Sequence, residues 1–451
     1  MTNQALNPAA ETCRAQSVRQ AAQRVMRRCD ELAGCTDRAG EITRLFCSPA
    51  MRKAHAALQG WMETVGMRCR FDPAGNLIGR LEADGARLNG ADTARSPGAG
   101  RPALLIGSHL DSVVNAGKYD GTLGVLLGLA VAEVAAELKI ELPFALEAVA
   151  FCEEEGVRYQ TPYFGSRALV GDVPAALLER QDADGIALAC ALRSFGGDPD
   201  RLAECVYRPE QVVAFVEPHI EQGPILDDQS LGVGVVTGIV GQHRAGLQFV
   251  GQAGHAGTVP MASRHDALAA AAQFIVELEQ FAAAERNLVA TIGRVEVMPN
   301  VGNVIPGEVR LGLDLRHADD DVRRPAFDEV VRRANAIARQ RGLEFKLLWS
   351  QEEGRVEFDA TCVRLLEQAV AQAGVRQVGL TSGAGHDAVV MAAHFRTAML
   401  FVRCARGVSH HPAEAVSESD VCLALDVLLR FVDNLAAARA PAAAASVFSR
   451  T

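Results

Sequence analysis

The chain has 451 residues, of which 49% are hydrophobic and 22% charged, and its formal net charge is −10 at pH 7. The length predicts two or three domains that each bury a core, and the composition is that of a soluble globular protein. The negative charge and the lack of a basic run argue against a nucleic-acid partner.

The first hundred residues predict helices followed by a short hairpin. Apolar residues at helical spacing predict helices over 14–32 and 50–65. Residues 70–80 predict two short strands around a Pro-Ala-Gly-Asn turn. Residues 84–101 are rich in Gly, Ala, Asp and Arg, which indicates a solvated loop that carries no chemistry.

Three apolar runs further along predict buried strands, and polar residues follow each of them. The runs and the residues that follow them are 103–106 with His109, Asp111 and Asp120; 144–152 with Glu153, Glu154 and Glu155; and 213–217 with His219. Each feature alone has an ordinary explanation: a helix cap through Asp120, a solvated acidic turn, or a structural histidine. The recurrence of one layout favours a bound cation instead, because adjacent carboxylates at the end of a buried strand repel each other.

From about residue 235 the pattern changes. Thr237–Gly241 predicts a strand start punctuated by glycines, and 244–251 alternates as a strand does. A helix over 265–286, strands over 287–299 and 308–316, a helix over 319–341 and a strand over 343–350 follow. This order is that of a split βαβ, or ferredoxin-like, unit. We therefore expect an inserted domain over 236–350 between the two parts of the first domain, 1–235 and 351–437.

The second part of the first domain begins with a helix over 361–373. A glycine-rich turn over 381–388 contains His386 and Asp387, which could cap the next helix and receive no catalytic role. A buried strand over 398–402 is followed by His410, and Ser417 is a plausible N-cap for the last helix. An Ala-rich tail over 438–451 is expected to fray.

The cysteines and the chain start predict a cytoplasmic protein. Eleven cysteines are scattered without a CxxC pair, which favours reduced thiols over a cysteine zinc site. Residues 1–16 have neither the basic start nor the apolar core of a signal peptide. The longest apolar run, 125–132, is too short to span a membrane, so no membrane partner is expected.

The polar residues at the strand ends can together hold two divalent metal ions, such as Zn or Mn. They are His109, Asp120, Glu154, Glu155, His219 and His410. An aspartate can bridge two ions roughly 3.5–4 Å apart, which polarise a carbonyl and activate a water. One carboxylate must stay free to accept the proton of that water, and the adjacent Glu154 and Glu155 offer a ligand and a base.

These stretches resemble one family over nearly the whole chain and in the family's order. The matching stretches are 107–112, 119–121, 153–156, 219–224, 254–258, 302–306, 314–316, 382–388 and 409–410. The family is that of the binuclear metal amidohydrolases, with allantoate amidohydrolase, N-carbamoyl-L-amino-acid hydrolase and β-ureidopropionase, relatives of the di-zinc aminopeptidases and carboxypeptidases. The resemblance implies an α/β fold: a mixed-sheet, peptidase-like di-metal catalytic domain with an inserted ferredoxin-like α+β domain for closure and dimerisation.

The resemblance also implies a role for each site residue. The implied metal ligands are His109, Asp120, Glu155, His219 and His410, with Asp120 bridging. Glu154 is implied as the general base, and Asp111 as the carboxylate that orients His109. The implied substrate contacts are Gln222, His255, Asn303, Arg316 and Gly385. His255 would stabilise the oxyanion, often in the partner subunit of a homodimer, and Arg316 would grip a substrate carboxylate.

Other interpretations stand beside these. His255 and Arg316 could be an ordinary polar patch, and Asn303 a plain turn residue. His411 departs from the Asn or Ser usual in relatives, and a position on the pocket wall is favoured over a role at the metals.

The implied activity is hydrolysis of the C–N bond of a ureido group beside a carboxylate. Residues 153–159 and 165–169 are most similar to allantoate enzymes, which release ammonia and carbon dioxide. The alternatives are an N-carbamoyl-L-amino-acid hydrolase or β-ureidopropionase, and, in another class, a non-catalytic ligand-binding protein on the same fold. The presence of Glu154 favours an enzyme, because a binding relic could lose the base and keep its ligands.

Overall fold

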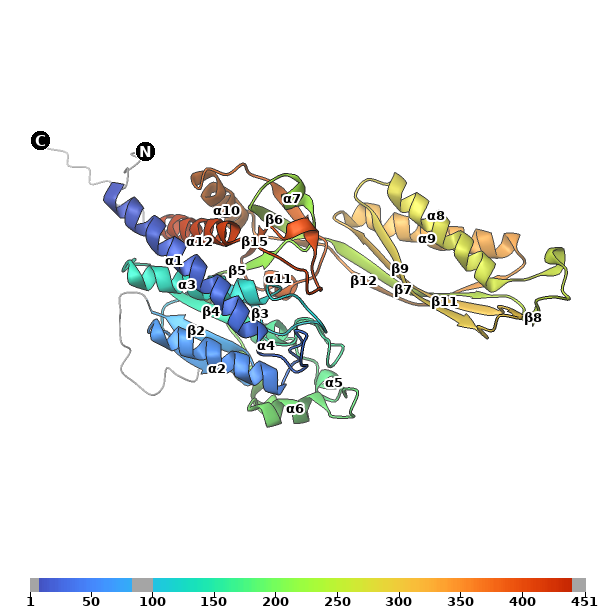
Figure 1. The fold of residues 1–451 in the computed structure, drawn as a ribbon, viewed down its shortest axis with the longest axis horizontal. Coiled ribbons are helices and arrows are strands. Elements are labelled where there is room, and N and C mark those ends of the chain that lie inside the picture. Colours follow the sequence, from blue (N-terminus) through green and yellow to red (C-terminus); the bar gives the residue numbers. More distant parts are fainter. Residues whose placement is uncertain (1–7, 83–99, 440–451) are drawn as a thin grey trace, which may run out of the picture. The chain divides into compact units, whose positions relative to one another are not determined.

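The computed structural model describes residues 8–82 and 100–439, and the chain divides into two compact units. The larger unit comprises 1–237, 358–380 and 385–451, and the smaller one comprises 238–357 and 381–384 (Figure 1). The smaller unit is therefore formed almost entirely by chain that runs between two parts of the larger one. Most of the loop expected over 84–101 and of the tail expected over 438–451 lies outside the described residues.

A mixed sheet of nine strands forms the centre of the larger unit. Its strands run in the order β1-β2-β4-β3-β5-β15-β6-β13, and β14 also pairs with β6. They are β1 (Arg68–Phe71), β2 (Leu77–Leu81), β3 (Ala103–His109), β4 (Ala145–Phe151), β5 (Val212–Ile220), β6 (Val233–Ile239), β13 (Val356–Glu357), β14 (Gly379–Ser382) and β15 (Thr397–Val402). The four adjacent strands β4, β3, β5 and β15 are parallel, so their carboxyl ends lie at one edge of the sheet.

Helices cover the sheet of the larger unit. The long ones, α1 (Pro8–Ala33), α2 (Pro49–Thr64), α3 (Thr122–Glu137), α10 (Ala360–Gln372) and α12 (Glu418–Arg439), share one apolar core with the strands. The remaining segments are α4 (Phe164–Val170), α5 (Ala175–Leu178), α6 (Leu188–Phe195), α7 (Ile225–Asp228), α11 (Asp387–Ala392) and the 3₁₀ turns η3 (Pro199–Cys205), η4 (Pro209–Gln211) and η6 (Ala405–Gly407). The Ser417 hydroxyl oxygen accepts the Asp420 N–H at 3.1 Å. Ser417 is therefore the N-cap of α12, as the sequence predicted.

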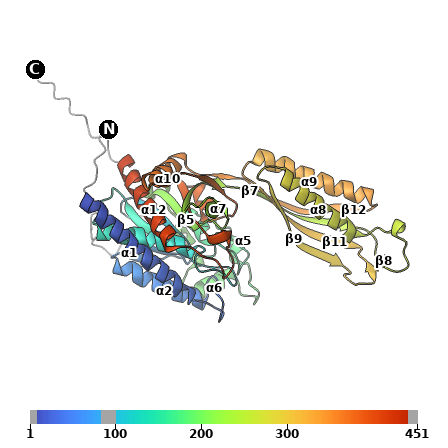
Figure 2. The ribbon, with the colours of Figure 1, turned by 45° about the horizontal axis from the view of Figure 1, so that its top comes forward.

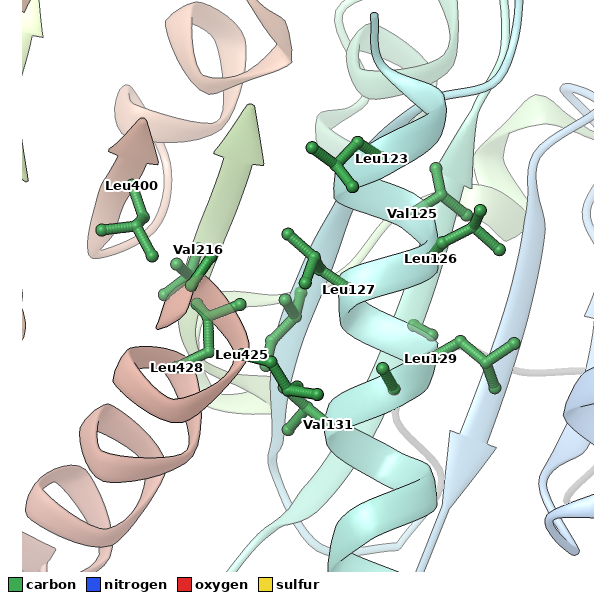
Figure 3. Close-up of a cluster of buried hydrophobic side chains, with 14 of the residues drawn as sticks. Leu123, Val125, Leu126, Leu127, Leu129, Val131, Val216, Leu400, Leu425 and Leu428 are labelled. Carbon is green, nitrogen blue, oxygen red and sulfur yellow. The ribbon is translucent and has the colours of Figure 1, made fainter. Parts of the chain in front are cut away.

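Helix α3 is buried on nearly all sides, which explains its uniformly apolar sequence. Figure 3 shows Leu127 of α3 close to Val216 of β5 and to Leu425 of α12. The helix can approach the strands so closely because of its glycines: a Cβ on Gly124 would lie 2.1 Å from the Pro218 carbonyl oxygen. This packing holds the start of α3 directly beside the strand ends.

The smaller unit is a four-stranded antiparallel sheet with two helices on one face (Figure 2). Its elements are β7 (Gly241–Val250), α8 (Ala267–Ala284), β9 (Val289–Met298), β11 (Glu308–His317), α9 (Asp320–Gln340) and β12 (Glu344–Glu353), and the strand order is β12-β7-β11-β9. A two-stranded ribbon of β8 (Gly254–His255) and β10 (Val304–Ile305) and the turn η5 (Met261–Ser263) complete it. The βαββαβ order and this sheet are those of a ferredoxin-like unit.

Several elements differ from the sequence prediction at their ends. The strand expected over 213–217 extends through Ile220, so His219 lies within β5 and not beyond it. The strand start expected at Thr237–Gly241 is the end of β6, which pairs with β15 in the large sheet, followed by the start of β7. Helix α8 is long and apolar enough to cross a membrane by composition, but its buried face packs in the core of the smaller unit.

Candidate metal centre and active site

The candidate ligands converge at the carboxyl edge of the four parallel strands. His109 is the last residue of β3, and His219 is the last but one of β5. Glu154 and Glu155 follow β4, and His410 lies in the loop after β15. Ligands in α/β proteins collect at this edge, because the loops that follow adjacent parallel strands meet there.

Asp120 lies at the centre of three imidazoles. Its Oδ1 is 3.1 Å from Nε2 of His219 and 3.6 Å from Nε2 of His109. Its Oδ2 is 3.0 Å from Nε2 of His410. The two oxygens of one carboxylate therefore face different histidines, which is the arrangement required of a ligand that bridges two metal ions.

Asp120 does not cap helix α3, which was the ordinary explanation for this residue. The N-cap position is Gly121, and no side chain caps the helix there. Gly121 has a φ of 61°, and a Cβ on it would lie 2.4 Å from the His109 ring. Glycine is needed here for both the backbone conformation and the close approach of the ring.

Main-chain carbonyls orient the two buried histidines. Nδ1 of His109 lies 3.0 Å from the Asp111 carbonyl oxygen, and Nδ1 of His219 lies 2.9 Å from that of Ile220. Because a carbonyl only accepts hydrogen bonds, each Nδ1 carries the hydrogen. Each Nε2 then faces Asp120, and it can bind a metal ion once it carries no proton of its own.

The carboxylate of Asp111 has a different task from the one expected. It lies 3.9 Å from Nδ1 of His109, too far for the hydrogen bond that the sequence predicted. Its two oxygens instead accept the main-chain N–H groups of Glu154 and Glu155, both at 3.1 Å. Asp111 thus fixes the backbone that presents the two glutamates, while its main-chain oxygen orients His109.

Glu154 and Glu155 occupy different positions around the histidines. Oε1 of Glu155 lies 3.6 Å from Nε2 of His410 and, although buried, has no hydrogen-bond partner among the described residues. Oε2 of Glu154 lies 4.0 Å from Nε2 of His109. The third member of the acidic run, Glu153, turns away and accepts the Tyr159 N–H.

Burial and neighbouring charges displace the pKa values of these groups. Burial alone would raise the pKa of Asp120, but hydrogen bonds from the three imidazoles outweigh it and hold that pKa well below 3.8. Burial raises the pKa of Glu154 well above its ordinary value; the charge of His109 opposes this in part, and that of Glu155 adds to it. Burial also raises the pKa of Glu155 to about 7. A raised pKa makes each of these carboxylates a stronger proton acceptor when it is ionised.

The donors fit two divalent ions. The His109, Asp120 and His219 donors lie within 4.8 Å of one another, and so do those of Asp120, Glu155 and His410. Asp120 belongs to both groups, and the unpartnered Oε1 of Glu155 faces the second. Imidazole and carboxylate suit Zn and Mn alike. His109, Glu154 and Glu155 form a third overlapping group.

Two of the expected substrate contacts lie beside this centre in the larger unit. Nε2 of Gln222 donates to Asp120 at 3.1 Å, and the buried Oε1 of Gln222 has no partner among the described residues. Gly385 lies against Tyr163, whose hydroxyl would be 1.9 Å from a Cβ at that position. His411 is exposed, and its Nδ1 accepts the Ala413 N–H, so it stabilises its own loop.

The other three expected contacts belong to the smaller unit and do not lie together. His255 and Asn303 are neighbours, because Val304 pairs with His255 and the Ala256 N–H donates to the Asn303 carbonyl. Arg316 lies at the far end of β11, eight residues beyond Glu308. Since a strand rises about 3.3 Å per residue, Arg316 is roughly 26 Å along β11 from the end next to His255.

The guanidinium of Arg316 is held in a fixed orientation. Its Nε and Nη2 donate to the two oxygens of Asp314, both at 2.8 Å, and its Nη1 donates to the Gly383 carbonyl at 2.7 Å. Arg244 also donates to Asp314, at 3.2 Å. This network fixes the plane of the guanidinium group, as a site for a planar carboxylate requires.

Comparison with known proteins identifies the family. The pattern of peptidase family M20/M25/M40 matches residues 105–434, which include the whole metal centre. The chain belongs to this family. The mixed α/β, peptidase-like fold and the resemblance to metal amidohydrolases that the sequence predicted are thereby confirmed.

Relatives of this M20 chain carry two kinds of name. The chain is 39% identical over 397 residues to the N-carbamoyl-L-amino acid amidohydrolase of Geobacillus stearothermophilus, with 88% of this chain and 94% of that one covered. It is 37% identical over 441 residues to the allantoate deiminase of Arabidopsis thaliana, with 90% and 81% covered. A solved hydantoinase/carbamoylase-family amidase from Burkholderia multivorans is 30% identical, with a TM-score of 0.81 and 92% and 98% covered. This M20 chain is a metal-dependent amidohydrolase.

Arg44 and Glu217 also build the M20 site and were not predicted from the sequence. Arg44 is buried and donates to the Leu110 carbonyl at 2.6 Å and to the Thr122 hydroxyl at 2.8 Å, which fixes both loops that carry His109 and Asp120. Glu217 is fully buried and accepts the Ser108 hydroxyl and the Ala388 N–H. A charged residue in an otherwise apolar strand was the available signal for Glu217, whereas nothing in the sequence near Arg44 marked it.

Proposed function

We propose that this chain hydrolyses the C–N bond of a ureido group in a small carboxylate substrate, and that the substrate is allantoate. One observation carries the proposal: Asp120 lies between three imidazoles, with Glu154 and Glu155 beside it. His109, Asp120 and His219 would hold one divalent ion, and Asp120, Glu155 and His410 a second, either Zn or Mn. When bound, two such ions polarise a carbonyl and make a water acidic.

Glu154 is the general base in this proposal. Its raised pKa and its position beside His109 suit a carboxylate that takes the proton of the attacking water. The same carboxyl group then returns the proton to the leaving nitrogen, so that ammonia departs. The carbamate that remains on the substrate nitrogen then loses carbon dioxide, which leaves the free amine of a ureidoglycine-type product.

The substrate is held by groups of both units. Arg316, fixed by Asp314, would bind the substrate carboxylate, and His255 would stabilise the oxyanion. Gln222, Asn303 and Gly385 are proposed as further contacts. His255 and Arg316 lie near opposite ends of β11. The two side chains of one chain therefore cannot both contact the same small substrate molecule.

We therefore propose a homodimer in which His255 serves the active site of the partner chain. The smaller unit would supply the dimer contact and close over the substrate. Its edge strand β9 exposes Val289 and Val295, which are 58% and 48% exposed. Exposed apolar residues on an unpaired sheet edge favour association with a second chain.

A second candidate function is the hydrolysis of N-carbamoyl-L-amino acids or N-carbamoyl-β-alanine. It is favoured by the 39% identity to the Geobacillus stearothermophilus relative, against 37% to the allantoate deiminase. These substrates share the ureido group and carboxylate, so the same centre would act on them.

Ammonia release from a substrate panel tests the function. Chelator-stripped protein should be inactive and should regain activity with Mn or Zn, with kcat/KM highest for allantoate. A preference for an N-carbamoyl amino acid would establish the second candidate. Full activity of protein that remains free of metal would overturn the metal-dependent mechanism.

The free cysteines support a cytoplasmic location. All eleven are unpaired thiols, and the buried ones, such as Cys29 and Cys152, lie in apolar surroundings. Reduced thiols of this number are typical of a reducing compartment. Fractionation of the native cells would test this location.

A further inference from the structure

Glu414 makes unusual contacts close to the metal centre. It lies in the loop that follows His410, and only 5% of its surface is exposed. Its Oε1 accepts two main-chain N–H groups, from Tyr119 at 2.8 Å and from Asp120 at 3.1 Å. Glu414 therefore holds the backbone of Asp120, 294 residues away in the sequence.

A hydroxyl group connects Glu414 to the side chain of Asp120 as well. The Ser409 Oγ lies 3.1 Å from Oδ2 of Asp120 and 3.3 Å from Oε2 of Glu414. A serine hydroxyl has one hydrogen to donate, and both neighbours are acceptors, so the Ser409 hydroxyl is shared between two carboxyl groups. Both the main chain and the carboxylate of Asp120 are thus fixed from the loop that also supplies His410.

The opposing loop is shaped to receive Glu414. A Cβ on Gly117 would lie 2.4 Å from both Cβ and Cδ of Glu414. The φ of Gly117 is not in the left-handed region, so the approach of Glu414, and not the backbone conformation, excludes a side chain there. Gly117 and Glu414 form one contact that can be disturbed from either side.

We propose that Glu414 is a positioning residue that fixes Asp120 between the two groups of metal donors. Asp120 has to present one oxygen to each group, so a rotation about its side chain or a shift of its backbone would weaken the binding of both ions. The oxygens of Glu414 are occupied by N–H and O–H donors, which distinguishes it from a ligand. The inference rests on the two-metal site of the proposed function.

Metal affinity of stripped protein, measured by competition with a chromophoric chelator for Zn²⁺ or Mn²⁺, tests the proposal without reference to activity. Glu414→Ala should lower the affinity for at least one ion by about 10–100-fold, as the loss of partners that orient metal ligands does. Glu414→Gln keeps an oxygen for the two N–H groups, so its affinity should exceed that of Glu414→Ala by about tenfold. Equal losses in both variants would overturn positioning by hydrogen bonds, because Glu414→Gln removes the charge and keeps an acceptor oxygen.

Two further variants separate positioning from general stability. Glu133→Gln removes a buried carboxylate on α3 that pairs with Arg24 and Arg28, away from the ligands, and should lower the melting temperature while leaving metal affinity unchanged. Gly117→Ala keeps Glu414 but displaces it, and should reproduce the loss of affinity. If Glu414→Ala does not fold, Gly117→Ala decides.

Wild-type affinity in Glu414→Ala, or in Gly117→Ala when Glu414→Ala does not fold, would overturn this inference. Wild-type protein that binds no ion would overturn the proposed function itself, so the two failures are distinguishable.

Discussion

Asp120 shows how much of this site depends on single contacts. The residue is 4% exposed, and three imidazoles, the Gln222 amide and the Ser409 hydroxyl all lie within hydrogen-bonding range of its carboxylate or close to it. A carboxylate surrounded by this many donors stays ionised even when buried, because hydrogen bonds to the charged form offset the loss of hydration. The surroundings of Asp120 thus favour the ionised carboxylate, which is the form that can bridge two metal ions.

The adjacent glutamates should respond differently to the same substitution. Glu154→Gln removes the proposed base but no expected ligand, so turnover should fall by roughly 10²–10⁴-fold while metal content is retained. Glu155→Gln should weaken metal binding, because Oε1 of Glu155 faces the donor group of Asp120 and His410. Steady-state kinetics and atomic absorption on both variants make the comparison. Normal turnover in Glu154→Gln would assign the base to another residue.

His55, which belongs to none of the metal-donor groups, should make stability depend on pH. It packs against the rings of Phe71 and Phe195, and neither of its ring nitrogens has a hydrogen-bond partner among the described residues. Burial, aided by the charges of Arg44 and Arg52, lowers the pKa of His55 to about 3. In the unfolded chain an imidazole takes up a proton below about pH 6.5, whereas folded His55 does not until about pH 3.

The unfolded state therefore binds the extra proton, and stability falls as the pH falls through this window. Relative to His55→Leu, the wild type should lose about 1.4 kcal/mol of unfolding free energy per pH unit below pH 6.5. Urea unfolding at pH 5 and pH 8 measures the difference. His394→Leu, at an exposed histidine of the same unit, is the control. Parallel pH profiles for the wild type and His55→Leu would contradict the prediction.

At the scale of elements, the parallel arrangement of β4, β3, β5 and β15 creates the site. Each strand is fully buried, and its ligand lies near its carboxyl end or in the loop that follows. An antiparallel neighbour would carry its following loop to the opposite edge. The antiparallel strands β2 and β6 flank this group and contribute no metal donor among the described residues.

Strand β11 of the smaller unit offers a test of substrate binding. Arg316→Lys replaces a planar fork held by Asp314 with a single ammonium group, so KM for a carboxylated ureido substrate should rise by roughly 10–100-fold. Metal content should not change. Arg310→Lys is the matched control, because the exposed Arg310 lies on the same strand face and pairs with Glu308 at 2.8 Å. An unaltered KM in Arg316→Lys would exclude Arg316 as the carboxylate site.

At the scale of the whole molecule, the positions of His255 and Arg316 predict active sites shared between chains. Inactive His255→Ala chains mixed with inactive Glu154→Gln chains should recover activity after subunit exchange. In each hybrid dimer one site would combine its own Glu154 with His255 of the other chain. Random pairing makes half of the dimers hybrid, so about a quarter of the wild-type activity should return.

The reverse mixture provides the control. If His255 acts across the dimer, wild-type chains mixed with His255→Ala, Glu154→Gln double-variant chains should lose about half of their activity on exchange. If His255 serves its own chain, the first mixture stays inactive and the second is unchanged. Light scattering on each mixture verifies the dimer and the exchange.

The amino-acid sequence by itself determined the chemistry of this protein. A buried strand and the loop that follows it consist of consecutive residues, so their pattern is local. Such patterns are the apolar runs that are followed by His109, by Glu154 and Glu155, and by His219. The alternation of strands and helices between β7 and β12 likewise follows from local periodicity. These patterns sufficed for buried strands that end in candidate metal ligands, and the resemblance of the motifs to a known family supplied the metal-dependent amidohydrolase class.

Only the tertiary structure decided which atoms serve which purpose. In the structure, the main-chain carbonyl of Asp111 orients His109, and the Asp111 carboxylate does not. Arg44 donates hydrogen bonds to the two loops that carry His109 and Asp120. The tertiary structure also brought Glu414 to Asp120 and put His255 and Arg316 near opposite ends of one strand. Such contacts join residues far apart in the chain, and their distances depend on strand order and packing, which no local pattern encodes.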